Sequence, residues 1–373
     1  MSVSDGSDSR SALDAALDIH RVRQYFDVIV RGRDVALAAR KDVRFLQALR
    51  RGMLPLPVDR QPAPGQVFEP MQGEPPPALP GRVGVVATGG SGAMACLVGV
   101  AKALEDCGTA VSVYSVCSGS ALFGFPLGAG MPPDEVAELT ASARPSDYVD
   151  VGWRELAALG PTLGRGWNGV LRGDKLEHFF EGQLGGLTLR QLKTPTYAPI
   201  WNVEHNRLEF IGPRTYPDMP VAHAIRLAVS MPLLMQPVML DGLSWCDGGI
   251  VDIFPVRPVL DIEPAVDVAI AVNGFYPSEF RGDDVTGWND RLFSILAAAS
   301  QVRTSQHAQL AREHLARLRR EARTLLVEPV PYGTVAGTGF YEQFLDNREW
   351  PAFMRSGRSA MLAALQQEAL TPA

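Results

Sequence analysis

Apolar, β-branched runs alternate with helical patterns from residue 82 onward, and this alternation constrains the fold more than any other feature. The runs and the helical patterns, in chain order, are "RVGVVAT" (82–88), "ACLVGVAKALED" (95–106), "AVSVYSV" (110–116), "ALFGFPLGAG" (121–130), "VDVAIAVNG" (266–274), an amphipathic stretch over about 287–321, and "RTLLVEPV" (323–330). Apolar strands separated by helices are typical of a sheet whose two faces are both covered. The sequence therefore predicts an α/β fold with a mainly parallel central sheet sandwiched by helices.

The first 80 residues follow a different pattern. Apolar residues at helical spacing between residues 11 and 50 predict two helices, interrupted near Gly32. From Pro55 to Pro80 the chain is rich in proline, which disfavours helix and interior strand. We therefore expect a helical extension and a proline-rich connector over residues 1–80, followed by one α/β domain over residues 81–373.

The N-terminal extension is locally basic. Between Arg10 and Arg60 there are 11 basic and 6 acidic residues. This excess would suit peripheral contact with an anionic membrane surface. The alternative, which we prefer, is that the extension packs on the main domain with its charges in water.

Composition and charge exclude several classes of protein. Nucleic-acid binding needs a basic face, and a net charge of −6 gives no electrostatic case for it, although a local basic patch could exist. No stretch approaches the length of a membrane-spanning helix, and the N-terminus lacks the layout of a signal peptide. Four cysteines without CxxC spacing and six scattered histidines indicate neither a disulfide scaffold nor a metal site. We expect a cytoplasmic protein without a metal or other cofactor. The sequence does not indicate its oligomeric state.

Two strand-to-helix turns carry candidate chemistry. In "VATGGSGAMACLV" a strand is followed by glycines and then by a helix, which is typical of an oxyanion hole or a phosphate cradle but also of an ordinary turn. In "VYSVCSGSALFG" Ser118 follows a strand and precedes a helix, as the serine of a nucleophile elbow does. Of the residues two positions away, Ser120 is small and Val116 is not.

A third motif, "SWCDGGIVDIFPV", places Asp247 before two glycines. Asp before Gly-Gly is usually only a turn. The three motifs in this order, however, resemble those of the patatin-like phospholipase family. "GGSGAM" is similar to its glycine-rich oxyanion loop GGGxRG, "VCSGSAL" to GxSxGAL, and "CDGGIVDIFPV" to its DGG or DGA motif with DNxPV.

The resemblance extends over about residues 82–260 and includes "LRGDKLEHFFEGQLGGLTLRQLKTPTYAPIWNVEHNRLEF" and "IRLAVSMPLLMQPV". It implies a three-layer fold, Ser118 as the nucleophile and Asp247 as its partner, in a dyad without histidine. Ala121 and Leu122 correspond to the AL of the family motif and fix this register. The resemblance also implies an oxyanion hole formed by Gly89, Gly90, Ser91 and Gly92.

This sequence departs from the family pattern at several positions. The replacements are Val116 and Ser120 for the two elbow glycines, Ala93 for the arginine and Met94 for the last glycine of the oxyanion loop, and Ile253 for the asparagine after the DGG. A valine at the elbow should crowd the turn. These departures leave open whether the site is active.

The expected function is that of a serine lipid acyl hydrolase, similar to phospholipase A or an esterase. Its substrate would be a lipid or another acyl ester. The alternatives are an acyltransferase that uses the same dyad and a catalytically retired lipid-binding protein. The predicted substrate-binding residues are Phe123, Phe125, Leu127, Leu233, Leu234 and Met235.

Two histidines are alternative candidates for the base, and two cysteines lie next to the dyad residues in the sequence. His205 and His223 fit surface or capping roles better than that of a base, and Cys117 and Cys246 adjoin the dyad in sequence as expected packing residues.

Overall fold

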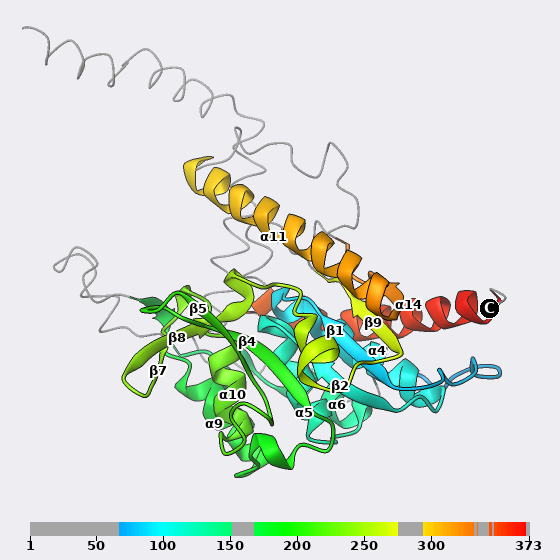
Figure 1. Ribbon diagram of the computed structural model, residues 1–373. Helices are drawn as coiled ribbons and strands as arrows, with labels where there is room; N and C mark the ends of the chain where they lie inside the picture. Colours follow the sequence, from blue (N-terminus) through cyan, green and yellow to red (C-terminus); the bar gives the residue numbers. More distant parts are fainter. Residues whose placement is uncertain are drawn as a thin grey trace, which may run out of the picture.

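The computed structural model describes residues 67–150, 168–274, 294–331, 334, 343–344 and 347–370. The centre of this part is an eight-stranded sheet in the order β10-β9-β1-β2-β4-β8-β7, with β5 paired to β4 (Figure 1). The strands are β1 (Val83–Ala87), β2 (Val111–Ser115), β4 (Thr196–Asn202), β5 (Arg207–Ile211), β7 (Val238–Leu240), β8 (Leu243–Asp247), β9 (Val268–Val272) and β10 (Arg323–Val327). A separate two-stranded sheet pairs β3 (Gly169–Leu171) with β6 (Leu233–Met235).

Most of the central sheet is parallel. Strands β10, β9, β1, β2 and β4 run in one direction, and β5, β8 and β7 add antiparallel pairings beyond β4. This arrangement confirms the predicted α/β class with a mainly parallel sheet. The antiparallel pairings also give Asp247 its place, because Asp247 ends β8 opposite Ile200 of β4.

Helices cover both faces of the sheet. The α-helices are α4 (Cys96–Asp106), α5 (Ala121–Gly128), α6 (Pro133–Ser142), α7 (Pro145–Tyr148), α9 (Asp174–Leu184), α10 (Val221–Ala228), α11 (Ser294–Glu321) and α14 (Trp350–Leu370). Short turns of other helix types are η1 (Ser91–Ala95), η2 (Ser118–Ser120), η3 (Leu189–Gln191), η4 (Gly248–Ile250), η5 (Pro258–Ile262) and η7 (Asn347–Glu349). Helix α11 crosses one face, whereas α4, α5, α6, α10 and α14 lie on the other (Figure 1).

Alternation along the strands separates two cores. Val85 and Ile270 belong to the larger core beneath α4 and α14, whereas their neighbours Val86 and Ala269 belong to the smaller core beneath α11. Successive side chains of a strand point to opposite faces, so every residue of β1 and β9 is buried. The continuous apolar runs in the sequence follow from this burial on both faces.

Helix α14 packs closely on α4 because each helix has a glycine at the contact. A Cβ atom on Gly99 would lie 1.8 Å from the carbonyl oxygen of Met354, and one on Gly357 would lie 2.0 Å from that of Cys96. Arg358 also forms an ion pair with Asp106 at 2.5 Å. The C-terminal helix is therefore an integral part of the layer that covers α4.

The described end of the proline-rich connector, residues 67–80, contains neither helix nor strand, as predicted for that stretch. It packs on the domain: Phe68 is buried in the larger core with the guanidinium of Arg358 5.8 Å from its ring centre, and the amide of Leu79 donates to Thr109 at 3.0 Å. The predicted helices between residues 11 and 50 lie outside the described residues, and the boundary at residue 80 stays a prediction.

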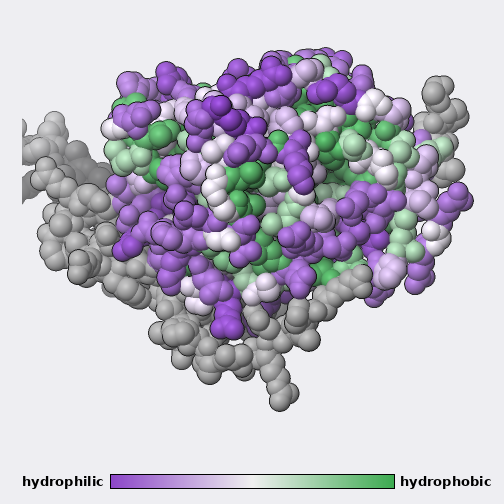
Figure 2. All heavy atoms as spheres, turned by 90° about the horizontal axis from the view of Figure 1, so that it is seen from below, coloured by the Kyte–Doolittle hydropathy of each residue, from purple (hydrophilic) through white to green (hydrophobic). Residues whose placement is uncertain are grey.

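The surface of the described part is mixed in character. The view from below in Figure 2 shows apolar residues in patches between polar ones. Among the helices of the described ranges, none has both the length and the apolar character needed to cross a bilayer.

Candidate active site

Ser118 occupies a strained turn between β2 and α5. Its backbone has φ +50°, a left-handed conformation that residues other than glycine rarely adopt. Strand β2 ends at Ser115, Ser118 opens the short turn η2, and α5 begins at Ala121. The side chain is buried but retains 7% of its exposure. This strand-turn-helix geometry is that of a nucleophile elbow.

Ser120 has a different part in the same turn. Its hydroxyl accepts a hydrogen bond from the amide of Cys117 at 2.7 Å and donates one to the carbonyl of Cys117 at 2.8 Å. The side chain is completely buried. Ser120 therefore closes the turn, because both hydrogen bonds of its hydroxyl are to backbone groups of Cys117.

Val116 fits the elbow because a glycine faces it. The side chain is completely buried, and a Cβ atom on Gly124 would lie 2.4 Å from its Cγ1 atom. The bulk that the valine adds is thus accommodated where α5 has no side chain. The crowding expected from the sequence is relieved by a residue eight positions away.

Asp247 lies at the end of β8, where it meets the elbow. Its carboxylate accepts a hydrogen bond from the amide of Gly249 at 2.7 Å, and the side chain of Ser118 is close enough to stabilise its charged form. The residue is 2% exposed, and this burial raises its pKa from 3.8 to about 7 although Ser118 and the amide of Gly249 favour the charged form. A carboxylate with this pKa is suited to taking up and releasing a proton near neutral pH.

The glycine-rich loop contacts the elbow directly. Gly90 has φ +155° and Ser91 φ +57°, and a Cβ atom on Gly119 would lie only 2.0 Å from the carbonyl oxygen of Ser91. The amide of Gly89 is occupied, since it donates to the carbonyl of Ile253 at 3.1 Å. Of the four predicted oxyanion residues, Gly90, Ser91 and Gly92 remain as candidate donors of a backbone N–H.

Gly119 was not among the predicted site residues. In a nucleophile elbow the amide of the residue after the serine is an oxyanion donor. Its position directly after Ser118 was the signal in the sequence. Its close contact with Ser91 requires that it be glycine.

The replaced residues of the glycine-rich loop are buried beneath it. Ala93 and Met94 are both completely buried. The Sδ atom of Met94 accepts a long hydrogen bond from Thr88 at 3.9 Å, and a Cβ atom on Gly90 would lie 3.1 Å from that sulfur. Met94 therefore supports the loop from below by packing.

Residues 250–255, here called the strap, connect the parts of the site. The thiol of Cys117 donates to the carbonyl of Asp252 at 3.5 Å, and the carbonyl of Ile253 accepts from Gly89. The hydroxyl of Ser115 donates to the carbonyl of Pro255 at 2.5 Å. The strap thus touches the elbow and the glycine-rich loop, and it directly follows the Asp247 turn.

Two histidines of α11 hold the strap from the other side. His307 donates from Nε2 to the carbonyl of Ile250 at 2.8 Å. Nδ1 of His314 lies 2.7 Å from the carbonyl of Phe254 and 3.2 Å from the carboxylate of Asp252. Burial disfavours the charged ring of His314, but its carboxylate and carbonyl partners outweigh this and raise its pKa.

Sequence reasoning did not single out these two histidines, and their seven-residue spacing on one helix face was the available signal. The two candidate bases named from the sequence, His205 and His223, lie elsewhere. His205 is exposed in the turn between β4 and β5, and His223 pairs with Glu177 at 2.8 Å.

The cysteines beside the dyad are protonated packing residues. Burial raises the pKa of Cys117 well above its ordinary value and that of Cys246 to about 11. Neither Cys117 nor Cys246 forms a disulfide. Within the described ranges, no group of three or more His, Cys, Asp or Glu side chains is arranged to hold a metal ion.

The predicted substrate-binding residues lie mainly in the core. Phe123, Phe125 and Met235 are completely buried, Leu127 is 6% exposed and Leu234 is partly buried. The side chain of Leu233 lies outside the described part. An apolar cavity does adjoin α5, but it is lined by other side chains.

Part of the chain matches a known protein family. Residues 85–260 match the family model of the patatin-like phospholipases. The chain contains a patatin-like phospholipase domain. The family predicted from the three motifs is thereby confirmed. The patatin-like match begins in β1 and ends in η5, so α11, β10 and α14 lie beyond it.

Relatives of this patatin-like domain share only part of the chain. Uncharacterised NTE-family proteins of Mycobacterium tuberculosis and Mycobacterium bovis are 26% identical over 142 residues, which span 35% of this chain and 38% of theirs. Among solved structures, VipD from Legionella pneumophila has a TM-score of 0.45 at 15% identity, covering 78% of this chain and 68% of its own. Human GIVD cytosolic phospholipase A2 has a TM-score of 0.35 at 12% identity, covering 91% and 67%.

Proposed function

We propose that this protein is a serine lipid acyl hydrolase that cleaves acyl esters through Ser118 and Asp247. The observation that carries the proposal is a buried serine in a left-handed turn whose side chain stabilises the charged form of a buried carboxylate, Asp247, with a pKa raised to about 7. Non-glycine residues in a left-handed conformation, such as Ser118 and Ser91 here, cluster at functional sites. The patatin-like family match supports a lipid as substrate.

The reaction starts with proton transfer from the Ser118 hydroxyl to Asp247. The Oγ atom forms a bond to the ester carbonyl carbon, and the carbonyl oxygen becomes a tetrahedral oxyanion. When the intermediate collapses, the ester C–O bond breaks and the leaving alcohol takes the proton from Asp247. Water then attacks the acyl enzyme while Asp247 accepts its proton. The carboxylic acid leaves and the serine hydroxyl is restored.

Backbone amides stabilise the oxyanion in this scheme. The donors are Gly90, Ser91 and Gly92 of the glycine-rich loop together with Gly119 of the elbow. The contact between Gly119 and Ser91 supports this assignment, because it holds loop and elbow in a fixed relation. One well-placed donor of this kind contributes roughly 10² to 10³ in rate.

A fluorophosphonate probe tests the proposed nucleophile. Such a probe forms a covalent bond with an activated serine, so the wild-type protein should be labelled and should hydrolyse p-nitrophenyl butyrate. Ser118→Ala should lose both properties with an unchanged circular dichroism spectrum, since alanine keeps the Cβ atom and removes only the hydroxyl. Ser120→Ala is the matched control. A wild-type protein that is neither labelled nor active would refute the proposal and favour a retired lipid-binding protein.

The acyltransferase alternative shares every step up to the acyl enzyme. It differs in the group that accepts the acyl chain, which would be an alcohol, an amine or a thiol in place of water. Product analysis with and without added acceptors separates the two. Free carboxylic acid as the main product in the presence of acceptors would support the hydrolase.

A further inference from the structure

The glycine-rich loop carries a second serine in a left-handed conformation. Among the described residues other than glycine, those with a left-handed backbone are Ser91, Ser118, Asn206 and Asp241. Asn206 and Asp241 lie in the turns between β4 and β5 and between β7 and β8, and asparagine and aspartate adopt this conformation more readily than most residues. The two serines, by contrast, both lie at the proposed site. Ser91 has φ +57°, which a glycine would adopt without strain.

The hydroxyl of Ser91 is buried without a partner. The residue is 2% exposed, and its Oγ atom is one of four buried side-chain atoms in the described part of the chain that form no hydrogen bond with another protein group. Such burial is unfavourable, because folding removes the hydrogen bonds of the hydroxyl to water. The hydroxyl of Ser120 shows the usual arrangement, with two hydrogen bonds to the backbone of Cys117. Ser91 therefore combines two destabilising features, and a glycine at this position would remove both.

Ser91 lies against the elbow. Its Cα atom would be 2.7 Å from a Cβ atom on Gly119, the residue directly after Ser118. The hydroxyl is two bonds from that Cα atom, so it stays beside the elbow in every staggered rotamer. The amide of Gly119 is one of the proposed oxyanion donors. The Ser91 hydroxyl therefore adjoins the proposed oxyanion hole.

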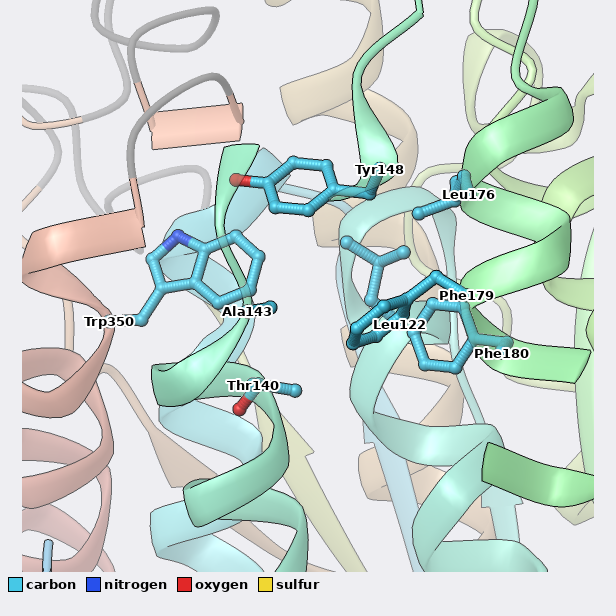
Figure 3. Close-up of a pocket in the computed structure, with 8 residues that line it drawn as sticks. All are labelled: Leu122, Thr140, Ala143, Tyr148, Leu176, Phe179, Phe180 and Trp350. Atoms are coloured by element: carbon cyan, nitrogen blue, oxygen red, sulfur yellow. The ribbon is translucent and has the colours of Figure 1, made fainter. Parts of the chain in front are cut away.

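The glycine-rich loop packs on Trp350, the indole labelled in Figure 3. A Cβ atom on Gly92 would lie 2.2 Å from the Nε1 atom of this indole, whose N–H donates to the carbonyl of Gln343 at 2.9 Å. The ring also packs edge-on against Phe123, with the centroids 5.2 Å apart. Packing of this kind maintains a strained backbone and keeps a donor in place before the substrate binds.

A hydroxyl at this position is not part of the family pattern. In "GGSGAM", Ser91 corresponds to the third glycine of GGGxRG and Ala93 to the arginine. The amide of Gly89 is already occupied by the carbonyl of Ile253. The Ser91 side chain thus adds a hydrogen-bond donor to a loop that otherwise offers only backbone amides at this point.

We propose that the Ser91 hydroxyl donates a hydrogen bond to the oxyanion that forms when Ser118 attacks the substrate. This proposal rests on the proposed function and adds a side-chain donor to its backbone donors. As the Oγ atom of Ser118 bonds to the ester carbonyl carbon and its proton passes to Asp247, the π electrons of the C=O bond move to the carbonyl oxygen. Ser91 keeps its own proton and donates a hydrogen bond to that oxygen. The bond strengthens as the negative charge develops, so it favours the transition state over the bound ester.

Ser91→Gly and Ser91→Ala test this role. Both variants lack the hydroxyl, so kcat and kcat/KM for p-nitrophenyl butyrate should fall together, roughly 10²- to 10³-fold, with little change in KM. The urea midpoint of Ser91→Gly should rise, since the variant loses both the left-handed strain and the unpartnered hydroxyl, and that of Ser91→Ala should not fall. A structural role would lower kcat and the urea midpoint together. That result, or an unchanged kcat, would overturn the proposal.

Asp241→Gly is the matched control. Asp241 has φ +53° and is exposed in the turn between β7 and β8. This variant also places a glycine at a left-handed position, but it should keep the wild-type kcat because the turn has no part in the reaction. An equal loss of kcat in Asp241→Gly and Ser91→Gly would contradict the assignment to the hydroxyl.

An alkyl trifluoromethyl ketone separates this proposal from the proposed function. The ketone adds to Ser118 as a tetrahedral anion, whereas the alcohol obtained by reducing it cannot. Ser91→Ala should weaken inhibition by the ketone roughly 10²-fold and leave inhibition by the alcohol unchanged. If the wild type hydrolyses the ester but the ketone inhibits both proteins equally, the role of Ser91 is wrong and that of Ser118 stands. If the wild type neither hydrolyses the ester nor binds the ketone, the Ser118 mechanism is wrong, and the role of Ser91 is wrong with it.

Discussion

Replacing Asp247 by asparagine should abolish activity and at the same time stabilise the folded protein at neutral and higher pH. Asparagine has nearly the same size, and its side-chain oxygen can still accept the hydrogen bond from the amide of Gly249. It cannot take up the serine proton, so turnover is lost. It also carries no charge, so it avoids placing a carboxylate in a buried site.

The magnitude follows from the pKa of Asp247. Burial raises that pKa from 3.8 to about 7, so the folded protein binds this proton more tightly than the unfolded chain does. The wild-type free energy of unfolding therefore falls as the pH rises through the window between the two values. One pKa unit corresponds to 1.36 kcal/mol, which gives a loss of about 4 kcal/mol in total. Asp247→Asn lacks this loss.

Urea denaturation of the two proteins at pH 4 and pH 8 measures the difference. At pH 4 the wild-type carboxyl is largely protonated in the folded state, so the two proteins should be similar in stability. At pH 8 Asp247→Asn should be more stable by several kcal/mol, up to the limit of about 4. A difference that stays constant between pH 4 and pH 8, or a variant that is less stable at pH 8, would refute the reasoning.

Four further predictions concern the proposed base, the elbow and α11. Because the base must be deprotonated to act, kcat/KM should rise about tenfold per pH unit below its pKa of about 7 and level off above it, in a stopped-time ester assay. Ser120→Ala should keep most of the activity but lower the free energy of unfolding by about 1 kcal/mol, because it removes the hydroxyl that closes the turn. Gly124→Ala should cost about 1–3 kcal/mol, since its methyl group would lie 2.4 Å from Val116, and adding Val116→Ala should restore the urea midpoint. His314→Leu should lower kcat without changing KM, and His314→Asn, which keeps a donor near the Nδ1 position, should recover most of the lost kcat. Gln309→Leu on the exposed face of α11 is the control. Equal kcat in all three variants would contradict a role of His314 in positioning the strap.

Local patterns in the sequence determined the class of fold. The runs around Val85 and Ile270 are apolar at every position because both faces of their strands are buried, and this signal is readable without neighbours. The strand-to-helix position of Ser118 is likewise a local pattern. The choice of Ser118 over Ser120 as the nucleophile is local too, because the neighbouring Ala121 and Leu122 fix the register of the motif. Patterns of this kind depend on backbone geometry over a few residues, so the sequence carries them directly.

Tertiary structure decided what depends on residues that are distant in the chain. The antiparallel strand β8 brings Asp247 to Ser118, and only burial in that place raises its pKa to about 7. Helices α6, α9 and α14 enclose the cavity with residues such as Ala143 and Trp350, although α14 lies outside the family match. Such contacts depend on which surfaces meet when the helices pack on the sheet. No short stretch of sequence specifies them, because the packing energy is shared among residues that are brought together only by the completed fold.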